Sequence, residues 1–130
     1  MKVLLDADVL IGALDRNDPH HRRARARFTT WREAQDALAI SVVNLTEVLI
    51  APSADPSKLS VAREAIAALG VGVHHPNDAI GVDAARLRGR HPISLPDAYC
   101  LATARHTGAT VSSFDQKILK AADREGISVS

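Results

Sequence analysis

The sequence has few cysteines, few aromatic residues and no long apolar run. A single cysteine among 130 residues excludes an internal disulfide and a zinc site built from cysteines, and it is typical of the reducing cytoplasm. Aromatic residues make up only 3% of the chain, so we expect a core of Leu, Val, Ile and Ala. Two acids interrupt the apolar N-terminal run, and no other run approaches membrane-spanning length. We therefore expect no signal peptide and no membrane association.

An excess of charge of either sign is also absent. The chain has 16 Lys and Arg against 15 Asp and Glu, which gives a net charge of +1. No overall field favours a polyanionic partner, although local clusters can still do so. The length predicts one domain, residues 1–130, with a substantial core. No pair of histidines has the spacing of a helical zinc motif.

Short apolar runs alternate with amphipathic segments along the whole chain. The runs predict strands and the segments between them predict helices. We expect strands at 2–5, 37–41, 71–73, 109–112 and 127–129, and helices at 9–14, 20–35, 43–50, 58–69, 76–90, between 94 and 108, and around 118. This alternation predicts an α/β fold with a mostly parallel sheet between helices.

Acidic residues stand at or near the ends of the expected strands. Asp6 follows the first strand, Asp8 comes two residues later, and Asp115 follows the fourth strand. Glu47 is the only acid on the helix after the second strand, and Asp97 opens the helix that leads into the fourth. Parallel α/β sheets bind their ligands beyond the carboxyl ends of the strands. We therefore expect these side chains to meet at one edge of the sheet.

Each acid also has a simpler interpretation. Asp8 and Asp115 can cap the helices that follow them, and Ser94 with Asp97 has the pattern of a capping box. A lone Glu47 on an apolar helix is often the residue that faces solvent. Because all of these acids are expected at one edge of the sheet, one shared site explains them better than a separate cap for each.

A cluster of carboxylates requires a cation, because neighbouring negative charges raise one another's pKa. Ligands that are all oxygen indicate Mg²⁺, with Mn²⁺ as a substitute, rather than zinc. Mg²⁺ also binds substrate phosphate, which predicts phosphoryl transfer to a water nucleophile. Without metal, repulsion among the acids should destabilise the folded protein increasingly as the pH rises.

The second expected helix carries arginines around an apolar stripe that includes Phe28 and Trp31. The arginines are candidates for contacts with phosphates, because Arg donates paired hydrogen bonds to phosphate, and they are Arg22, Arg23, Arg25, Arg27 and Arg32. Neutralising Arg22, Arg25 and Arg32 is expected to weaken RNA binding. A solvated helix face is the alternative interpretation.

Four motifs of the chain resemble those of the PIN-domain ribonucleases. They are Leu4-Leu5-Asp6-x-Asp8, Thr46-Glu47-Val48-Leu49, Pro96-Asp97-Ala98 and Ser113-x-Asp115. Length and motif order are similar to those of the VapC toxins of bacterial toxin–antitoxin pairs. The resemblance implies a three-layer sandwich with a parallel five-stranded sheet in the order 3-2-1-4-5. It also implies a Mg²⁺-dependent endoribonuclease that acts on RNA.

The resemblance further implies roles for individual residues. Asp6 and Asp97 would bind the metal ion, Glu47 would bind or activate a metal-bound water, and Asp115 would complete the site through water. It also implies a homodimer that a cognate antitoxin protein inhibits.

Two positions depart from the family pattern. Asp8 stands where the family usually has Asn or Ser, which adds a negative charge. Lys117 stands where many members have a further acid, which leaves Asp115 as the only acid of its loop.

Two other functions stay open. Asp6-x-Asp8 after an apolar strand also suits a phosphatase of the haloacid-dehalogenase type with Asp6 as nucleophile, although the segment 112–117 has one acid where that chemistry needs a pair. The third possibility is a non-catalytic RNA- or protein-binding module, in which the arginine helix is the surface and the acids are caps.

Overall fold

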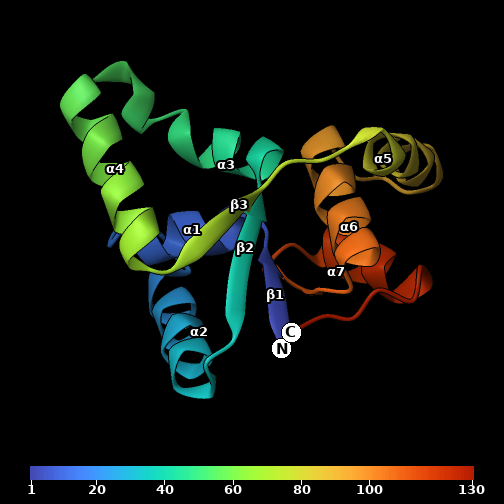
Figure 1. Ribbon diagram of the computed structural model, residues 1–130, viewed down its shortest axis with the longest axis horizontal. Coiled ribbons are helices and arrows are strands. Elements are labelled where there is room, and N and C mark those ends of the chain that lie inside the picture. Colours follow the sequence, from blue (N-terminus) through green and yellow to red (C-terminus); the bar gives the residue numbers. More distant parts are fainter.

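A sheet of four strands runs through the middle of the computed structural model, which describes residues 1–130 (Figure 1). The strands are β1 (Lys2–Leu5), β2 (Ala37–Ser41), β3 (Val71–His74) and β4 (Thr110–Ser112), in the order β3-β2-β1-β4. Every neighbouring pair is parallel. The carboxyl ends of all the strands therefore lie at the same edge of the sheet.

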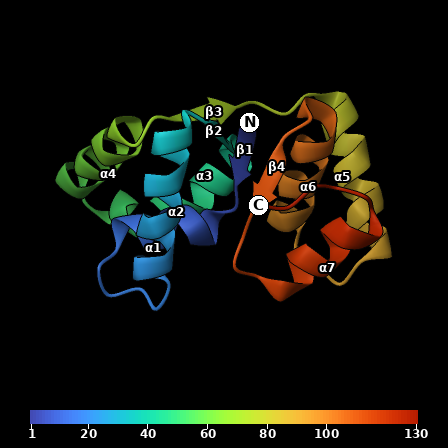
Figure 2. The same cartoon turned by 90° about the horizontal axis from the view of Figure 1, so that it is seen from below.

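Helices lie on both sides of the sheet (Figure 2). One side has α1 (Ala7–Leu14), α2 (His21–Ala34) and α4 (Pro56–Ala68), and the other has α5 (Asp78–Arg90), α6 (Leu95–Thr107) and α7 (Gln116–Arg124). The helix α3 (Val42–Leu49) follows β2 directly, and the 3₁₀ helix η1 (Pro52–Ala54) leads into α4. This arrangement confirms the predicted three-layer α/β fold. No helix is both long enough and apolar enough to cross a membrane.

The strand β1 sends its side chains alternately into two hydrophobic cores. Val3 and Leu5 are fully buried in the core that contains Phe28 and Trp31 of α2. Leu4 lies in the other core, among residues of α5, α6 and α7. Because side chains alternate along a strand and both faces are covered, β1 is apolar at each of these positions. The residue that follows β1 therefore enters a largely apolar environment.

The predicted fifth strand is reduced to a single bridge. Val129 pairs with Val111 of β4, and the backbone N–H of Val111 donates to the carbonyl of Ser128 at 2.9 Å. The segment lies beside β4, as the order 3-2-1-4-5 requires. Only Ile127 of this segment is buried, so little packing is available to hold a longer strand.

The predicted helices begin within two residues of their observed first residues. The difference that matters most for the site is at α1, which begins at Ala7 and not at the predicted Val9. Its N-cap is Asp6, so the interpretation of Asp8 as the cap of this helix is wrong.

A network of ion pairs connects α5, α6 and α7. Glu125, just after α7, hydrogen-bonds Arg90, His91 and Arg105 at 2.6–3.2 Å. Arg105 also donates two hydrogen bonds to Asp83 of α5, at 2.9 and 3.1 Å. The hydrogen bonds from Arg90 and His91, with that from Arg105, lower the pKa of Glu125 from 4.5 to about 2.

Replacing Glu125 by Gln should lower the melting temperature by a few degrees at neutral pH, because the amide keeps the shape of the side chain and removes its charge. Ionised Glu125 stabilises the folded state above its ordinary pKa of 4.5, and this contribution is lost as the pH falls toward about 2. The difference between wild type and Glu125→Gln should therefore shrink over this range in thermal unfolding followed by circular dichroism. Glu64→Gln, at an exposed position of α4, is the matched control and should change little. An equal difference at both ends of the range would contradict a contribution from charge.

Candidate active site

Asp6 lies at the carboxyl end of β1 and is only 4% exposed. Its Oδ1 accepts a hydrogen bond from the backbone N–H of Ala7 at 2.8 Å, and its Oδ2 accepts one from the Ser113 hydroxyl at 2.7 Å. Burial, reinforced by the charge of Asp8, raises the pKa of Asp6 from 3.8 to about 8, although the hydrogen bond from Ser113 acts in the opposite direction. Without a compensating cation, we therefore expect Asp6 to be mostly protonated at neutral pH.

Asp8, in the first turn of α1, contacts the loop between β4 and α7, which also contains Ser113. Its Oδ2 accepts a hydrogen bond from the backbone N–H of Phe114 at 3.0 Å, whereas its Oδ1 is buried and has no hydrogen-bond partner. Burial raises the pKa of Asp8, and the charge of Asp115 contributes in the same direction. A buried polar atom without a partner is unfavourable, so this oxygen is available to a cation or to a bound donor.

The loop between β4 and α7 brings three of the acids together. The Ser113 hydroxyl donates to Asp6 and accepts from the backbone N–H of Asp115 at 2.9 Å. The next residue, Phe114, donates its backbone N–H to Asp8. Because β4 pairs with β1 in parallel, this loop leaves the sheet beside the residue that follows β1. The pairing of the two strands thus places the acids side by side.

Asn44 connects Glu47 to the helix that carries Asp97. It is fully buried on α3, and its Nδ2 donates to Glu47 Oε1 at 3.3 Å and to the carbonyl of Pro96 at 3.1 Å. Its Oδ1 is buried without a partner. Burial raises the pKa of Glu47, and the charges of Asp97 and Asp8 add to this increase. The hydrogen bond from Asn44 holds Glu47 next to the other acids.

Asp97 is both a capping residue and a member of the acidic cluster. Its Oδ2 accepts from the backbone N–H of Ser94 at 3.2 Å, and its own N–H donates to the Ser94 hydroxyl at 3.3 Å, so the predicted capping box is confirmed. Burial raises the pKa of Asp97, and the charge of Asp115 adds to the effect. The charge of Asp97 in turn raises the pKa of Asp6. The acids predicted from the sequence thus lie within electrostatic reach of one another.

The ligands that this cluster offers suit a cation held partly through water. They are carboxylate and amide oxygens, and the buried Oδ1 atoms of Asp8 and Asn44 have no partner. No three His, Cys, Asp or Glu side chains lie close enough together to hold one ion by themselves. Mg²⁺ needs only one or two carboxylates, because it keeps several waters and also binds substrate phosphate. The residues present therefore fit Mg²⁺ better than an ion bound entirely by protein.

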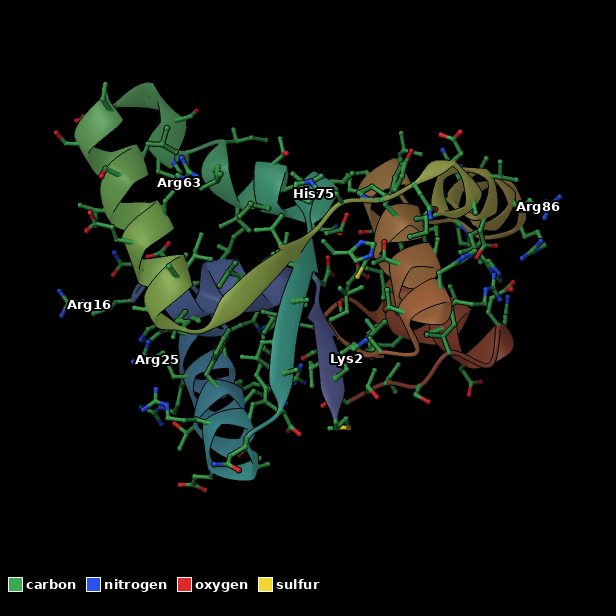
Figure 3. The ribbon with its side chains drawn as sticks, viewed as in Figure 1. Lys2, Arg16, Arg25, Arg63, His75 and Arg86 are labelled. Atoms are coloured by element: carbon green, nitrogen blue, oxygen red, sulfur yellow. The ribbon has the colours of Figure 1, made fainter.

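Two arginines of the predicted arginine surface, Arg23 and Arg27, lie beside the acids, although neither is among the three whose removal was expected to weaken RNA binding. Arg27 of α2 donates from Nη1 to the Ser112 hydroxyl at 2.8 Å, and its guanidinium lies 4.3 Å from the centroid of the Phe114 ring. The guanidinium of Arg23 lies 4.7 Å from the same centroid. Their spacing of four residues places both on one side of α2, but the sequence alone does not show which side of the helix faces the acids. The other three arginines of α2, Arg22, Arg25 and Arg32, are exposed. Figure 3 shows Arg25 extending away from the sheet.

An apolar groove of about 500 Å³ lies between α1, α3 and α4. Its lining includes Ile11 and Leu14 of α1, Val48 of α3 and Val61 of α4, together with Glu47. Because Glu47 belongs to both, the groove adjoins the acidic cluster.

Comparison with known proteins matches the chain to one family along almost its whole length. The family model described as "PIN domain" matches residues 3–124. The chain is also 35% identical to Ribonuclease VapC44 from Mycobacterium tuberculosis, and the match covers 91% of this chain and 89% of that protein.

Two solved structures are similar to this fold. A toxin–antitoxin complex from Klebsiella pneumoniae matches with a TM-score of 0.69 and 24% identity, over 90% of this chain and 89% of that chain. The structure of VapBC-1 from nontypeable Haemophilus influenzae matches with a TM-score of 0.73 and 15% identity, over 100% of this chain and 97% of that chain. The two structures share the fold, and the family model together with the 35% identical relative shows that the chain belongs to the PIN-domain family, as a member of the VapC type.

Proposed function

We propose that this protein is a Mg²⁺-dependent endoribonuclease and the toxin of a toxin–antitoxin pair. Its 35% identity to a protein named a ribonuclease supports the activity. The observation that carries the proposal is the meeting of acids from β1, α3, α6 and the loop after β4 at one edge of the sheet. Such an edge is where parallel α/β sheets bind ligands.

The acids divide the chemistry among them. Asp6 and Asp97 would hold the ion, which would neutralise charge on the phosphodiester and make water a better nucleophile. Glu47, which accepts a hydrogen bond from Asn44, would take the proton of the attacking water as its oxygen bonds to phosphorus. The opposite P–O ester bond breaks in the same step, and the leaving oxygen takes a proton from solvent. The pKa of Glu47, raised by burial, makes this side chain a better proton acceptor than an exposed carboxylate. Asp115 completes the site through water.

A phosphatase with Asp6 as nucleophile has less support, because that chemistry needs a pair of acids in the loop after β4. The loop after β4 supplies Asp115 without a second acid. A non-catalytic binding module is separated from the ribonuclease by a cleavage assay.

Asp6→Asn, Glu47→Gln and Asp97→Asn should each lower Mg²⁺-dependent cleavage of RNA by at least about 100-fold, because each keeps the shape of the side chain and removes its charge. Gel analysis of labelled RNA measures the rates, and circular dichroism checks the fold. Asp123→Asn, at an exposed position of α7 without an ion pair, is the matched control and should cleave at the wild-type rate. Near-normal cleavage by Asp97→Asn would contradict its assignment, and a wild type that cleaves no RNA would contradict the proposed activity.

The raised pKa of Asp6 predicts that the metal-free protein loses stability as the pH rises. A folded-state pKa of about 8 against 3.8 means that the contribution is fully present below the ordinary pKa and is lost as the pH climbs through about 8. In EDTA, Asp6→Asn should therefore melt at a higher temperature than wild type at alkaline pH, and the difference should shrink as the pH falls toward the ordinary pKa of 3.8.

Addition of Mn²⁺ should raise the melting temperature of wild type more than that of Asp6→Asn, because the ion binds only the folded state. Scanning calorimetry tests both halves. An equal metal-induced shift in the two proteins, or a less stable variant in alkaline EDTA, would mean that the acids are separate helix caps.

We also propose that a second copy of the chain and a cognate antitoxin are its protein partners. The similar structure from Klebsiella pneumoniae is described as a toxin–antitoxin complex, which supports the antitoxin as a partner. The apolar groove between α1, α3 and α4 is the proposed binding site of the antitoxin, because an antitoxin segment lying there would cover Glu47.

Val61→Glu should weaken binding of the antitoxin at least about tenfold, since it places a charge in the apolar groove. Val61 is 66% exposed, so the fold and RNA cleavage should be unaffected. Ala67→Glu adds the same charge to α4 outside the groove and serves as the control. Isothermal titration with the purified antitoxin measures the affinities, and equal affinities for the two variants would place the partner elsewhere.

A further inference from the structure

A cluster of basic side chains around one aromatic ring lies next to the acidic site. The ring of Phe114 stacks on His20 with centroids 4.5 Å apart, and the guanidinium groups of Arg23 and Arg27 lie 4.7 and 4.3 Å from its centroid. The backbone N–H of Phe114 is the group that donates to Asp8. This basic cluster (His20, Arg23, Arg27 and Phe114) and the acidic cluster therefore share one loop.

No acid of the protein forms a salt bridge with the two arginines of the basic cluster. Arg90 and Arg105, in contrast, pair with Glu125 elsewhere in the fold. Burial of Arg27, together with the charge of Arg23, lowers the pKa of Arg27. Two like charges held beside one ring repel each other unless an anion lies between or next to them. The cluster therefore has the electrostatics of an anion-binding site.

The geometry keeps donors free for such an anion. Arg27 uses Nη1 for the Ser112 hydroxyl and, at 3.4 Å, for the carbonyl of Ser113. A guanidinium has five N–H donors, so most of those on Arg27 remain available. Arg23 is exposed and makes no hydrogen bond through its side chain, and it lies one helical turn from Arg27. Contact with Phe114 restrains both planar groups by cation–π attraction.

We propose that Arg23 and Arg27 bind a phosphate of the RNA that neighbours the phosphate being cleaved, and that Phe114 orients the two guanidinium groups for this contact. The proposal rests on the ribonuclease function and adds the subsite that holds the RNA across the acidic cluster. Arg matches phosphate with paired hydrogen bonds, which a Lys does not. The net charge of +1 supplies no general attraction for RNA, so a local cation pair is needed to offset the repulsion from the acids.

The test removes one positive charge at a time from exposed arginines of the same helix, α2. Arg23→Gln should raise the dissociation constant for a fluorescent RNA oligonucleotide, measured by anisotropy in EDTA, by about fivefold, and it should lower the log–log salt slope by about 0.7. Arg22→Gln and Arg25→Gln, whose side chains are exposed on the same helix, are the matched controls and should keep the wild-type slope. In cleavage assays with Mg²⁺, Arg23→Gln should raise KM and change kcat much less.

Two further variants separate binding from a structural role. Arg27→Lys keeps the charge and loses the planar fork, so it should weaken binding with a nearly unchanged salt slope. Phe114→Leu should do the same, because both charges remain while their orientation is lost. Melting temperatures check that each variant folds.

Equal effects of Arg23→Gln and Arg22→Gln would overturn the proposed subsite. Two unchanged salt slopes would leave the helix as a solvated face, and two equally lowered slopes would mean diffuse contact with RNA along it. In either case wild type would still cleave RNA, so the ribonuclease function would stand. Absence of cleavage by wild type would instead contradict the function itself.

Discussion

The hydrogen bond from the Ser113 hydroxyl to buried Asp6 joins two segments that are 107 residues apart in the sequence. It depends on the parallel pairing of β1 with β4, in which Leu5 lies opposite Ser112. A shift of this register by one residue would turn the side chain of Ser113 to the opposite face of the sheet. Asp115 and Phe114 take their positions from the same loop, so the acidic and basic clusters both depend on this one strand pairing.

Helix capping and site formation use the same side chains here. Asp6 caps α1, Asp97 belongs to the capping box of α6, and Asp115 caps α7. Each of these helices begins at the carboxyl edge of the sheet, where its positive end favours a negative charge. Burial still raises the pKa of Asp6 and Asp97, so the helix ends position these acids without neutralising them. The remaining cost of charge is what the proposed cation would offset.

The sequence predicted the layers and the edge where the acids meet, because strand ends and helix starts are local features. From the sequence, helix capping and a shared acidic site were alternative explanations for these residues. In the structure, Asp6, Asp97 and Asp115 cap helices and also lie near one another. Whether Asp6 or Asp8 caps α1 is decided by backbone angles after β1, which composition does not reveal. The role of Asn44 depends on Pro96, which comes from a distant helix. The fifth strand was overestimated, because three residues of strand-forming type were too little to specify a ladder.

The arginine helix illustrates the same limit and explains how opposite charges coexist. Which arginines approach the acids depends on the rotation of α2 about its axis and on the position of Phe114, and both are set by tertiary packing. Arg27 lies near enough to Asp8 for the carboxylate to favour its charged form, yet its hydrogen bonds go to Ser112 and Ser113. A direct ion pair between Arg27 and Asp8 would have removed one ligand for a cation and one donor for a phosphate. Because Arg27 donates to Ser112 and Ser113 instead, both charges would remain available to their proposed counter-ions, a cation for Asp8 and a phosphate for Arg27.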